Sequence, residues 1–253
     1  MKTKLANFCK EVCETNRFFY SDDVNDFLEE LYQYCVSSRD DSRGNRIKLI
    51  SEGSKYYRAR AHSFQNTTNE YVKKSYDVKD MKPVPNMRSS GRLNAYNVNA
   101  LYLAEDKNIA VSEVRASANA PISVAKFEII QNLKVLKFDY VSDSFDWLSY
   151  SSPDVTYSLA TMFSMPLDNA EHQNREYIPT QIIAEFFKSK GIDGIEYPSQ
   201  FIAMSENEFK NQDLAQLRGI TKFNLCLFDI NSADCIPESI EVLKLKNRIN
   251  IVG

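Results

Sequence analysis

Residues 91–115 read GRLNAYNVNALYLAEDKNIAVSEVR, and this order of residue types predicts a turn, a short strand and a helix in succession. A glycine and several asparagines are typical of the turn, and the apolar run at 100–104 predicts a strand that carries Tyr102. Asp106 is suited to cap the helix that follows. The stretch places Arg92, a tyrosine and a glutamate where core packing requires none of them, so we interpret them as a site.

Glu113 lies on the apolar side of the predicted helix. It follows Ile109 by four residues and Ala110 by three, which are the spacings that place side chains on one helical face. Desolvating a carboxylate without a partner is costly. We therefore expect a basic group, a hydroxyl or a ligand beside Glu113. A structural carboxylate paired with Arg92 or Arg115 is the alternative.

The composition favours one main domain with a sizeable core. The chain has 253 residues, of which 43% are hydrophobic and 26% are charged. A net charge of -3 gives no overall attraction for nucleic acid, so small molecules and proteins are the expected partners. The sequence has no run of about eighteen apolar residues and no secretory signal, so we expect a cytoplasmic protein without a membrane partner. Five scattered cysteines suit reduced thiols.

The order of the predicted elements indicates an α+β fold with a bent or split β core, flanking helices and a helical N-terminal extension. We place the extension at residues 1–50 and the main domain at 51–253, with a polar segment at 37–46 near their border. Residues 65–88 are interpreted as a long loop that could close over a site. Apolar and alternating runs predict strands at 55–62, 100–104, 122–130, 133–138, 192–197 and 224–230. Helical periodicity predicts helices at 4–36, 158–163 and 180–191, with Thr180 as the cap of the last and Gly191 as its end.

Several kinds of catalytic site have little support. The two histidines, His62 and His172, are not near a glycine-flanked serine or cysteine, so a Ser-His-Asp hydrolase is disfavoured, and so is a metal centre. No glycine-rich phosphate loop of the usual kinds occurs. Arginines can hold a diphosphate instead, because their paired donors match phosphate oxygens. Arg58 and Arg60 share one face of the predicted strand at 55–62; a solvated edge or an ion pair is the alternative role for them.

Five segments, taken in order, resemble the RES domain family, which is named for an arginine, a glutamate and a serine. The segments are YYRARA at 56–61, GRLN at 91–94, ALYLAED at 100–106, Glu113, and REYIPTQ through GIDGIEYPS at 175–199. The resemblance covers most of residues 50–230 and leaves out the first fifty. RES domains are similar in fold to ADP-ribosyltransferases, so the resemblance implies an ADP-ribosyltransferase-like bent or split β core.

The resemblance also implies an activity and partners. RES domain proteins act largely as toxins of toxin-antitoxin pairs that consume NAD, so we expect an NAD glycohydrolase or phosphorylase that cleaves the nicotinamide-ribose bond. The implied partners are NAD, as substrate, and an antitoxin with an Xre-like helix-turn-helix region. No metal and no direct contact with nucleic acid are implied. Two alternatives stay open: a protein ADP-ribosyltransferase that uses the same pocket, and an inactive module that binds a nucleotide or a protein.

Five positions of this sequence match the motif residues of the family: Arg58, Arg92, Tyr102, Glu113 and Ser199. The choice between Arg58 and Arg60 stays open at this point, as do the oligomeric state, the identity of the antitoxin and the acceptor, which is water, phosphate or a protein side chain.

The resemblance suggests a role for each of these residues. A carboxylate near the sugar stabilises the positive charge that develops there when the glycosidic bond breaks, and we assign this role to Glu113. Arg58 and Arg92 would hold the diphosphate or a ribose. Tyr102 would pack on the nicotinamide ring or the ribose, with plain core packing as its alternative. Ser199 would orient Glu113 or bind a ribose hydroxyl, and its alternative is an ordinary turn serine.

Overall fold

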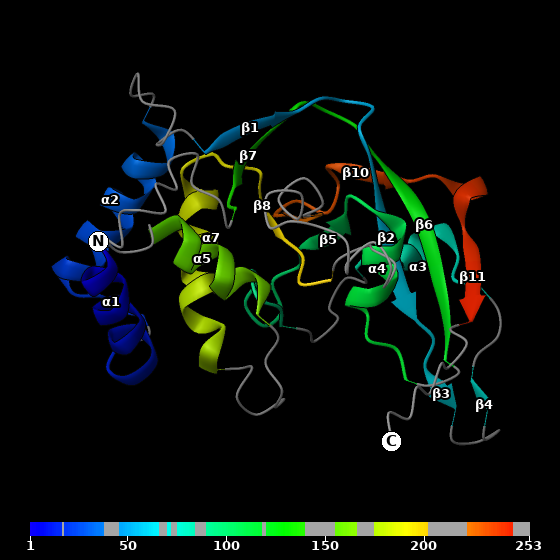
Figure 1. Cartoon of the computed structure of the whole chain (residues 1–253), viewed down its shortest axis with the longest axis horizontal. Helices are drawn as coiled ribbons and strands as arrows, with labels where there is room; N and C mark the ends of the chain where they lie inside the picture. Colours follow the sequence, from blue (N-terminus) through cyan, green and yellow to red (C-terminus); the bar gives the residue numbers. More distant parts are fainter. Residues whose placement is uncertain are drawn as a thin grey trace, which may run out of the picture.

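The structure, a computed structural model, describes residues 1–16, 18–37, 46–65, 70–71, 75–83, 90–117, 120–139, 155–165, 175–201 and 222–244. Helices flank one mixed sheet of nine strands, and a separate two-stranded ribbon lies beside it (Figure 1). The predicted α+β class is confirmed. None of the helices described in these ranges is long and apolar enough to cross a membrane.

The helices are α1 Lys2–Glu14, α2 Asp22–Val36, α3 Val78–Met81, α4 Lys107–Glu113, α5 Val155–Ser164 and α7 Ile178–Ser189, with a 3-10 turn η1 at Pro237–Ser239. The strands are β1 Ile47–Ile50, β2 Lys55–Ala61, β3 Phe64–Gln65, β4 Glu70–Tyr71, β5 Leu101–Ala104, β6 Pro121–Ile129, β7 Leu133–Lys137, β8 Gly194–Pro198, β9 Phe223–Leu227, β10 Ala233–Cys235 and β11 Glu241–Lys244.

The large sheet is split near its middle. Its strand order is β1-β7-β8-β9-β5-β2-β6-β10, and β11 also pairs with β6. Strand β2 pairs with β6 along its whole length, but its registered pairing with β5 is the single pair Tyr57 and Ala104. The two halves of the sheet are therefore joined at one point and diverge on either side of it. The predicted split of the β core is confirmed, and the divergence leaves room for a cavity.

Helix α7 packs between the N-terminal helices and the first half of the sheet (Figure 1). Buried aromatic side chains from α1, α2, α5 and α7 belong to one hydrophobic cluster: Phe8, Phe27, Phe163 and Phe187. Burying a side chain of this size stabilises a fold by about 1.5–3 kcal/mol. Ser21 caps α2, because its side chain accepts a hydrogen bond from the backbone of Val24. The division of the chain at residue 50 stays a prediction.

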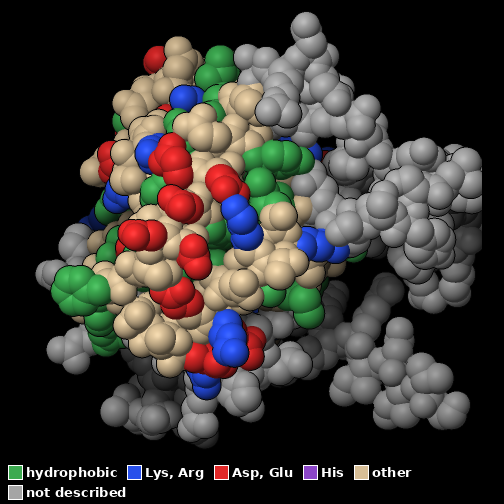
Figure 2. Space-filling model, turned by 90° about the vertical axis from the view of Figure 1, so that its left-hand side faces the viewer, with side chains coloured by type: hydrophobic (Ala, Val, Ile, Leu, Met, Phe, Trp, Pro, Cys, Tyr) green, Lys and Arg blue, Asp and Glu red, His purple; other side chains and the backbone are tan. Residues whose placement is uncertain are grey.

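The outer side of α2 is acidic. Figure 2 shows aspartate and glutamate side chains gathered on the face of the molecule that the N-terminal helices form. The acidic residues of α2 are Asp22, Asp23, Asp26, Glu29 and Glu30. Two of them pair with lysines of other segments, Glu29 with Lys190 at 2.5 Å and Glu30 with Lys4 at 2.6 Å. Exposed pairs of this kind contribute little to stability, so α2 is held by its apolar side.

Two local predictions were wrong. Helix α7 begins at Ile178 with Tyr177 as its cap, so Thr180 lies inside the first turn and is not the cap; Gly191, at φ 77°, follows the helix end as expected. Residues 65–88 were interpreted as loop, but they include the short helix α3, whose Met81 is fully buried. A one-turn helix is too short to give a periodic signal. Residues 38–45 of the predicted polar linker lie outside the described residues.

Candidate active site

A cavity of about 380 Å³ lies where β2 and β5 separate. Four of the five residues predicted for the site line it: Arg58 on β2, Arg92 in the turn before β5, Tyr102 on β5 and Glu113 at the end of α4. Ser199 is the fifth; it lies directly after β8 and contacts Glu113. The split in the sheet therefore brings together residues from five separate segments of the chain. Cavities of about 300–1,000 Å³ are typical of small-molecule sites.

Helix α4 carries the Glu113 carboxylate to the cavity wall. Asp106 caps the helix as predicted, by accepting hydrogen bonds from the backbone of Asn108 at 2.7 Å and Ile109 at 3.3 Å. The apolar side of α4 is buried against β2, β5 and β6, which fixes the direction in which Glu113 points. The hydroxyl partner expected for this carboxylate is Ser199, whose Oγ donates to Glu113 Oε1 at 2.8 Å.

Ser199 is itself held in place. Its Oγ accepts a hydrogen bond from the backbone N–H of Phe201 at 3.1 Å, and its own N–H donates to the carbonyl of Lys222 at 2.8 Å. The single hydroxyl proton is then directed at Glu113. In the described residues this proton meets the Glu113 carboxylate, which is itself assigned to the substrate and accepts the proton as a hydrogen bond. The geometry fits a serine that orients the carboxylate rather than one that attacks a substrate.

Arg58 brings a partly buried positive charge to the cavity. Its Nε donates to the carbonyl of Met81 and one terminal nitrogen donates to the carbonyl of Tyr102, both at 2.8 Å. Burial and the neighbouring Arg60 lower the pKa of Arg58 to about 10, which still leaves it charged at neutral pH. Within the described part of the chain, neither Arg58 nor Arg92 has a carboxylate at ion-pair distance. A partly buried cation without a counter-ion favours an anionic ligand.

Arg60 lies outside the cavity lining. One of its terminal nitrogens donates to the carbonyl of Asp80, and its guanidinium stacks 4.6 Å from the ring centroid of Tyr76. Both contacts attach α3 and the segment before it to β2. The geometry thus places Arg58, rather than Arg60, where a ligand would bind.

The hydroxyl of Tyr102 fixes the turn that carries Arg92. It accepts from the backbone N–H of Leu93 at 3.0 Å and donates to Asn94 Oδ1 at 2.7 Å. Burial raises the pKa of Tyr102 well above its usual value, so the hydroxyl keeps its proton. Gly91 packs so closely here that an added Cβ would lie 2.5 Å from the Tyr102 hydroxyl, which explains the glycine. Tyr102 thus lines the cavity with its ring and holds the turn with its oxygen.

The start of α7 holds the same turn from the other side. Thr180 Oγ1 donates to the carbonyl of Arg92 at 2.5 Å, and Gln181 Nε2 donates to the carbonyl of Gly91 at 2.8 Å. The guanidinium of Arg92 donates to the carbonyl of Phe163 at 3.1 Å. These contacts give a physical role to the IPTQ sequence at 178–181. Both polar residues donate to the turn, and Thr180 Oγ1 also lies 2.9 Å from the carbonyl of Tyr177.

Sequence reasoning missed several residues of the cavity. Tyr57, Tyr177 and Tyr197 also line it, and Asn224 donates from Nδ2 to Glu113 Oε1 at 2.6 Å. Asn224 is 4% exposed. A polar residue inside the apolar run FNLCL at 223–227 is a signal that could have found it, since a buried amide needs a partner. The three tyrosines gave no comparable signal, because aromatic residues are common in cores.

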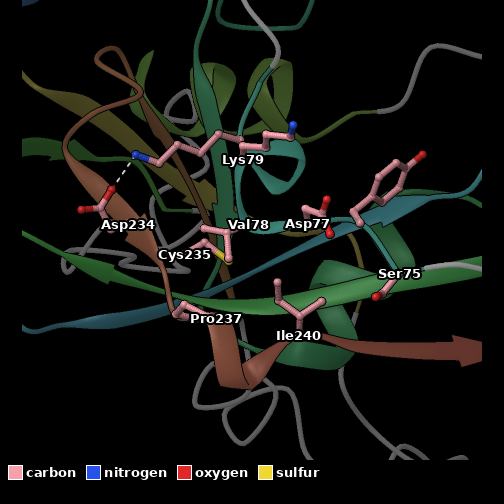
Figure 3. A pocket seen from close by; sticks show the side chains of 10 residues that line it. Ser75, Asp77, Val78, Lys79, Asp234, Cys235, Pro237 and Ile240 are labelled. Atoms are coloured by element: carbon pink, nitrogen blue, oxygen red, sulfur yellow. Dashed lines mark hydrogen bonds and ion pairs between the residues drawn. The ribbon is translucent and has the colours of Figure 1, made fainter.

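A second, larger cavity of about 920 Å³ lies between α3 and the β10–η1 segment (Figure 3). Figure 3 shows Lys79 and Asp77 at its rim and the apolar side chains of Val78, Pro237 and Ile240 in its wall. It contains none of the predicted site residues. Lys82, which also lines it, is paired with Asp234 at 2.6 Å. It is larger than the cavity at the split, and its described lining includes carboxylates but no arginine. We therefore assign the chemistry to the cavity at the split.

Over the ranges that the structure describes, no group of three or more His, Cys, Asp or Glu side chains is placed to hold a metal ion. The ionisable side chains that line the cavity at the split are one carboxylate, two arginines and four tyrosines.

These features define an α+β protein with a split sheet whose cavity joins an oriented carboxylate to two arginines. The family model described as RES domain matches residues 56–239, and the chain belongs to the RES domain family. No curated protein matches the chain in sequence. One similar solved structure is the crystal structure of the M. tuberculosis MbcT-MbcA toxin-antitoxin complex, with 12% identity, a TM-score of 0.37, and coverage of 78% of this chain and 86% of that chain.

Proposed function

We propose that this protein consumes NAD by cleaving the bond between nicotinamide and ribose, and that it is a toxin normally restrained by an antitoxin. One observation carries the catalytic part: a carboxylate held by two hydrogen bonds shares a cavity with two partly buried arginines that have no described carboxylate partner. A ligand that satisfies both features carries negative charge at one end and develops positive charge at the other. NAD has this character.

The arginines account for binding. Planar guanidinium groups match phosphate oxygens, and Arg58 is held by two backbone carbonyls, so little of its freedom is left to lose when a ligand binds. We assign the diphosphate of NAD to Arg58 and Arg92. The rings of Tyr102, Tyr177 and Tyr197 offer aromatic surface for the nicotinamide and ribose parts. The cavity volume of about 380 Å³ suits the reacting half of a dinucleotide, with the remainder extending outward.

Glu113 accounts for the chemistry. When the glycosidic bond breaks, its electron pair goes to the nicotinamide nitrogen, neutral nicotinamide leaves, and positive charge develops on the ribose. A carboxylate fixed beside the sugar lowers the energy of this transition state. Addition of water gives ADP-ribose and releases one proton, whereas addition of phosphate gives a phosphorylated ADP-ribose. Both acceptors remain part of the proposal.

Membership of the RES domain family supports the biological part of the proposal. The expected partner is an antitoxin with an Xre-like helix-turn-helix region, and the expected location is the cytoplasm, where NAD is available. Neither a metal ion nor direct binding to nucleic acid is part of this proposal.

The test compares the wild type with Glu113→Gln, under tight induction in bacteria and as purified proteins. Wild-type protein should deplete intracellular NAD and stop growth, and the purified enzyme should release nicotinamide from NAD, with the second product identified by mass spectrometry in the presence and absence of phosphate. Glu113→Gln should do neither while it unfolds at an unchanged temperature. Glu185→Gln, an exposed carboxyl on α7, is the matched control.

The other outcomes separate the alternatives. Arrested growth with unchanged NAD, together with transfer of label from NAD to a protein in a lysate, would replace the proposal by a protein ADP-ribosyltransferase. Soluble protein with no effect on growth or NAD would favour a binding module. Full turnover by Glu113→Gln would overturn the assignment of the carboxylate.

A further inference from the structure

The two hydrogen bonds that Glu113 receives both end on the same oxygen. Ser199 Oγ donates to Oε1 at 2.8 Å, and Asn224 Nδ2 donates to Oε1 at 2.6 Å. From the residues that the structure describes, Oε2 receives no hydrogen bond. The carboxylate is therefore anchored through one oxygen, and the second oxygen is left for the cavity that Glu113 lines.

We propose that Asn224 is a positioning residue, which acts with Ser199 to hold Oε1 of Glu113 and to leave Oε2 facing the substrate. The kinetic part of this inference rests on the proposed function. The structural part, the effect of Asn224 on the carboxylate, stands without it.

The position of Asn224 in the sheet supports this role. Strand β9 lies between β8 and β5, and Asn224 is paired in register with Tyr197 on one side and Ala104 on the other. Backbone contacts on both sides leave the residue little freedom. The amide is therefore presented to Glu113 from a strand that is paired on both sides, while Glu113 comes from a helix over the junction.

The chemistry of the two donors explains why both can bind the same oxygen. An ionised carboxylate only accepts hydrogen bonds, so an amide N–H and a hydroxyl can both point at one of its oxygens. Asn224 and Ser199 are 4% and 6% exposed, so water competes little for either donor. The remaining ionisable groups that line the cavity around Glu113 are arginines and tyrosines, residue types that titrate in the alkaline range: Tyr57, Arg58, Arg92, Tyr102, Tyr177 and Tyr197.

The sharpest test is Asn224→Asp, which preserves shape but replaces the donor by a second carboxylate. Two carboxylates this close share one proton, so one of them titrates at a higher pH. Protein labelled with carbon-13 at glutamate side-chain carboxyls reports the titration of Glu113, whose signal is assigned by its loss in Glu113→Gln. The matched control is Asn108→Asp, which adds the same charge to an exposed position of α4. We expect the titration curve of Glu113 to become coupled to that of the new carboxylate in Asn224→Asp, and to stay as in the wild type in Asn108→Asp.

The kinetic readout is the pH profile of NAD turnover. The acid limb of kcat should move to higher pH in Asn224→Asp, and kcat at neutral pH should fall by about tenfold to 100-fold, the range for one hydrogen bond to a charged group, with KM changed about twofold or less. A merely structural asparagine would lower thermal stability without moving the acid limb. If the wild type consumes no NAD, the proposed function fails, but the titration of Glu113 still decides the present inference.

Two results would overturn it. One is an Asn224→Asp variant whose Glu113 titrates as in the wild type. The other covers the case in which Asn224→Asp does not fold. Asn224→Ala removes one donor without adding charge, and an unchanged carbon-13 chemical shift of the Glu113 carboxyl in that variant would also refute the role of Asn224.

Discussion

Ser199 donates a hydrogen bond of 2.8 Å to Glu113 although the two residues are 86 positions apart in the chain. The contact joins the end of β8 to the end of α4, two elements from different sides of the cavity. It also defines what Ser199 can do, because its proton is directed at the carboxylate and its oxygen accepts from Phe201. The serine of this RES domain is therefore placed to orient the glutamate.

Ser199→Ala should reduce turnover without abolishing it. The substitution removes one of the two donors to Glu113 and leaves Asn224, so we expect kcat to fall about tenfold to 100-fold, the effect of one hydrogen bond to a charged group. Steady-state kinetics with NAD measure this. Loss of all activity comparable to that of Glu113→Gln, in a folded protein, would instead indicate a nucleophile.

Arg92→Ala should weaken NAD binding, with KM raised about tenfold or more, because a charged donor to the ligand is lost. Arg58→Ala should weaken binding and also lower the free energy of unfolding by about 1–3 kcal/mol, since the carbonyls of Met81 and Tyr102 lose their donor. Calorimetric titration with NAD and thermal unfolding separate the two effects. Arg60→Ala is the control: a loss of NAD affinity as large as in Arg58→Ala would show that the wrong arginine was chosen.

Tyr102→Phe should lower stability by about 1–3 kcal/mol and weaken NAD binding, although the ring is kept. The hydroxyl holds both Leu93 and Asn94, and its removal leaves a buried donor and acceptor without their partner. Tyr96→Phe, at a side chain 55% exposed, should change neither property. Denaturant unfolding and NAD titration measure both effects. Wild-type stability and NAD affinity in Tyr102→Phe would show that the hydroxyl contributes nothing and that only the aromatic ring matters.

Gly91→Ala should displace the turn that carries Arg92. The new methyl group would lie 2.3 Å from Asn94 Oδ1 and 2.5 Å from the Tyr102 hydroxyl, and such overpacking typically costs about 1–3 kcal/mol. We expect reduced stability together with reduced NAD affinity. Gly191→Ala is a useful comparison, because its φ of 77° strains the backbone after α7 but nothing lies within 4 Å of the added carbon. It should reduce stability alone, and equal effects of both variants on affinity would contradict the proposed function of the turn.

Local patterns were sufficient for the elements that carry the site. The capped helix α4 and the apolar strand β5 follow from residues within a few positions of each other, so the sequence predicts where Glu113 and Tyr102 lie on their elements. The alternation of KYYRARA likewise predicts β2 and the common face of Arg58 and Arg60. The alternation does not distinguish Arg58 from Arg60, because both arginines lie on the side of β2 where α3 packs.

The sequence by itself determined the α+β class, the elements that carry the site and, through the motif residues, the family. The tertiary structure decided which side chains meet: that Arg58 and not Arg60 lines the cavity, that Thr180 holds the Arg92 turn instead of capping α7, and that Asn224 shares Glu113 Oε1 with Ser199. The physical reason is the range of the interactions. Helix periodicity and capping act between neighbours in the chain. The hydrogen bonds to the Glu113 carboxylate instead join residues that are 86 and 111 positions apart, and only folding brings these residues together.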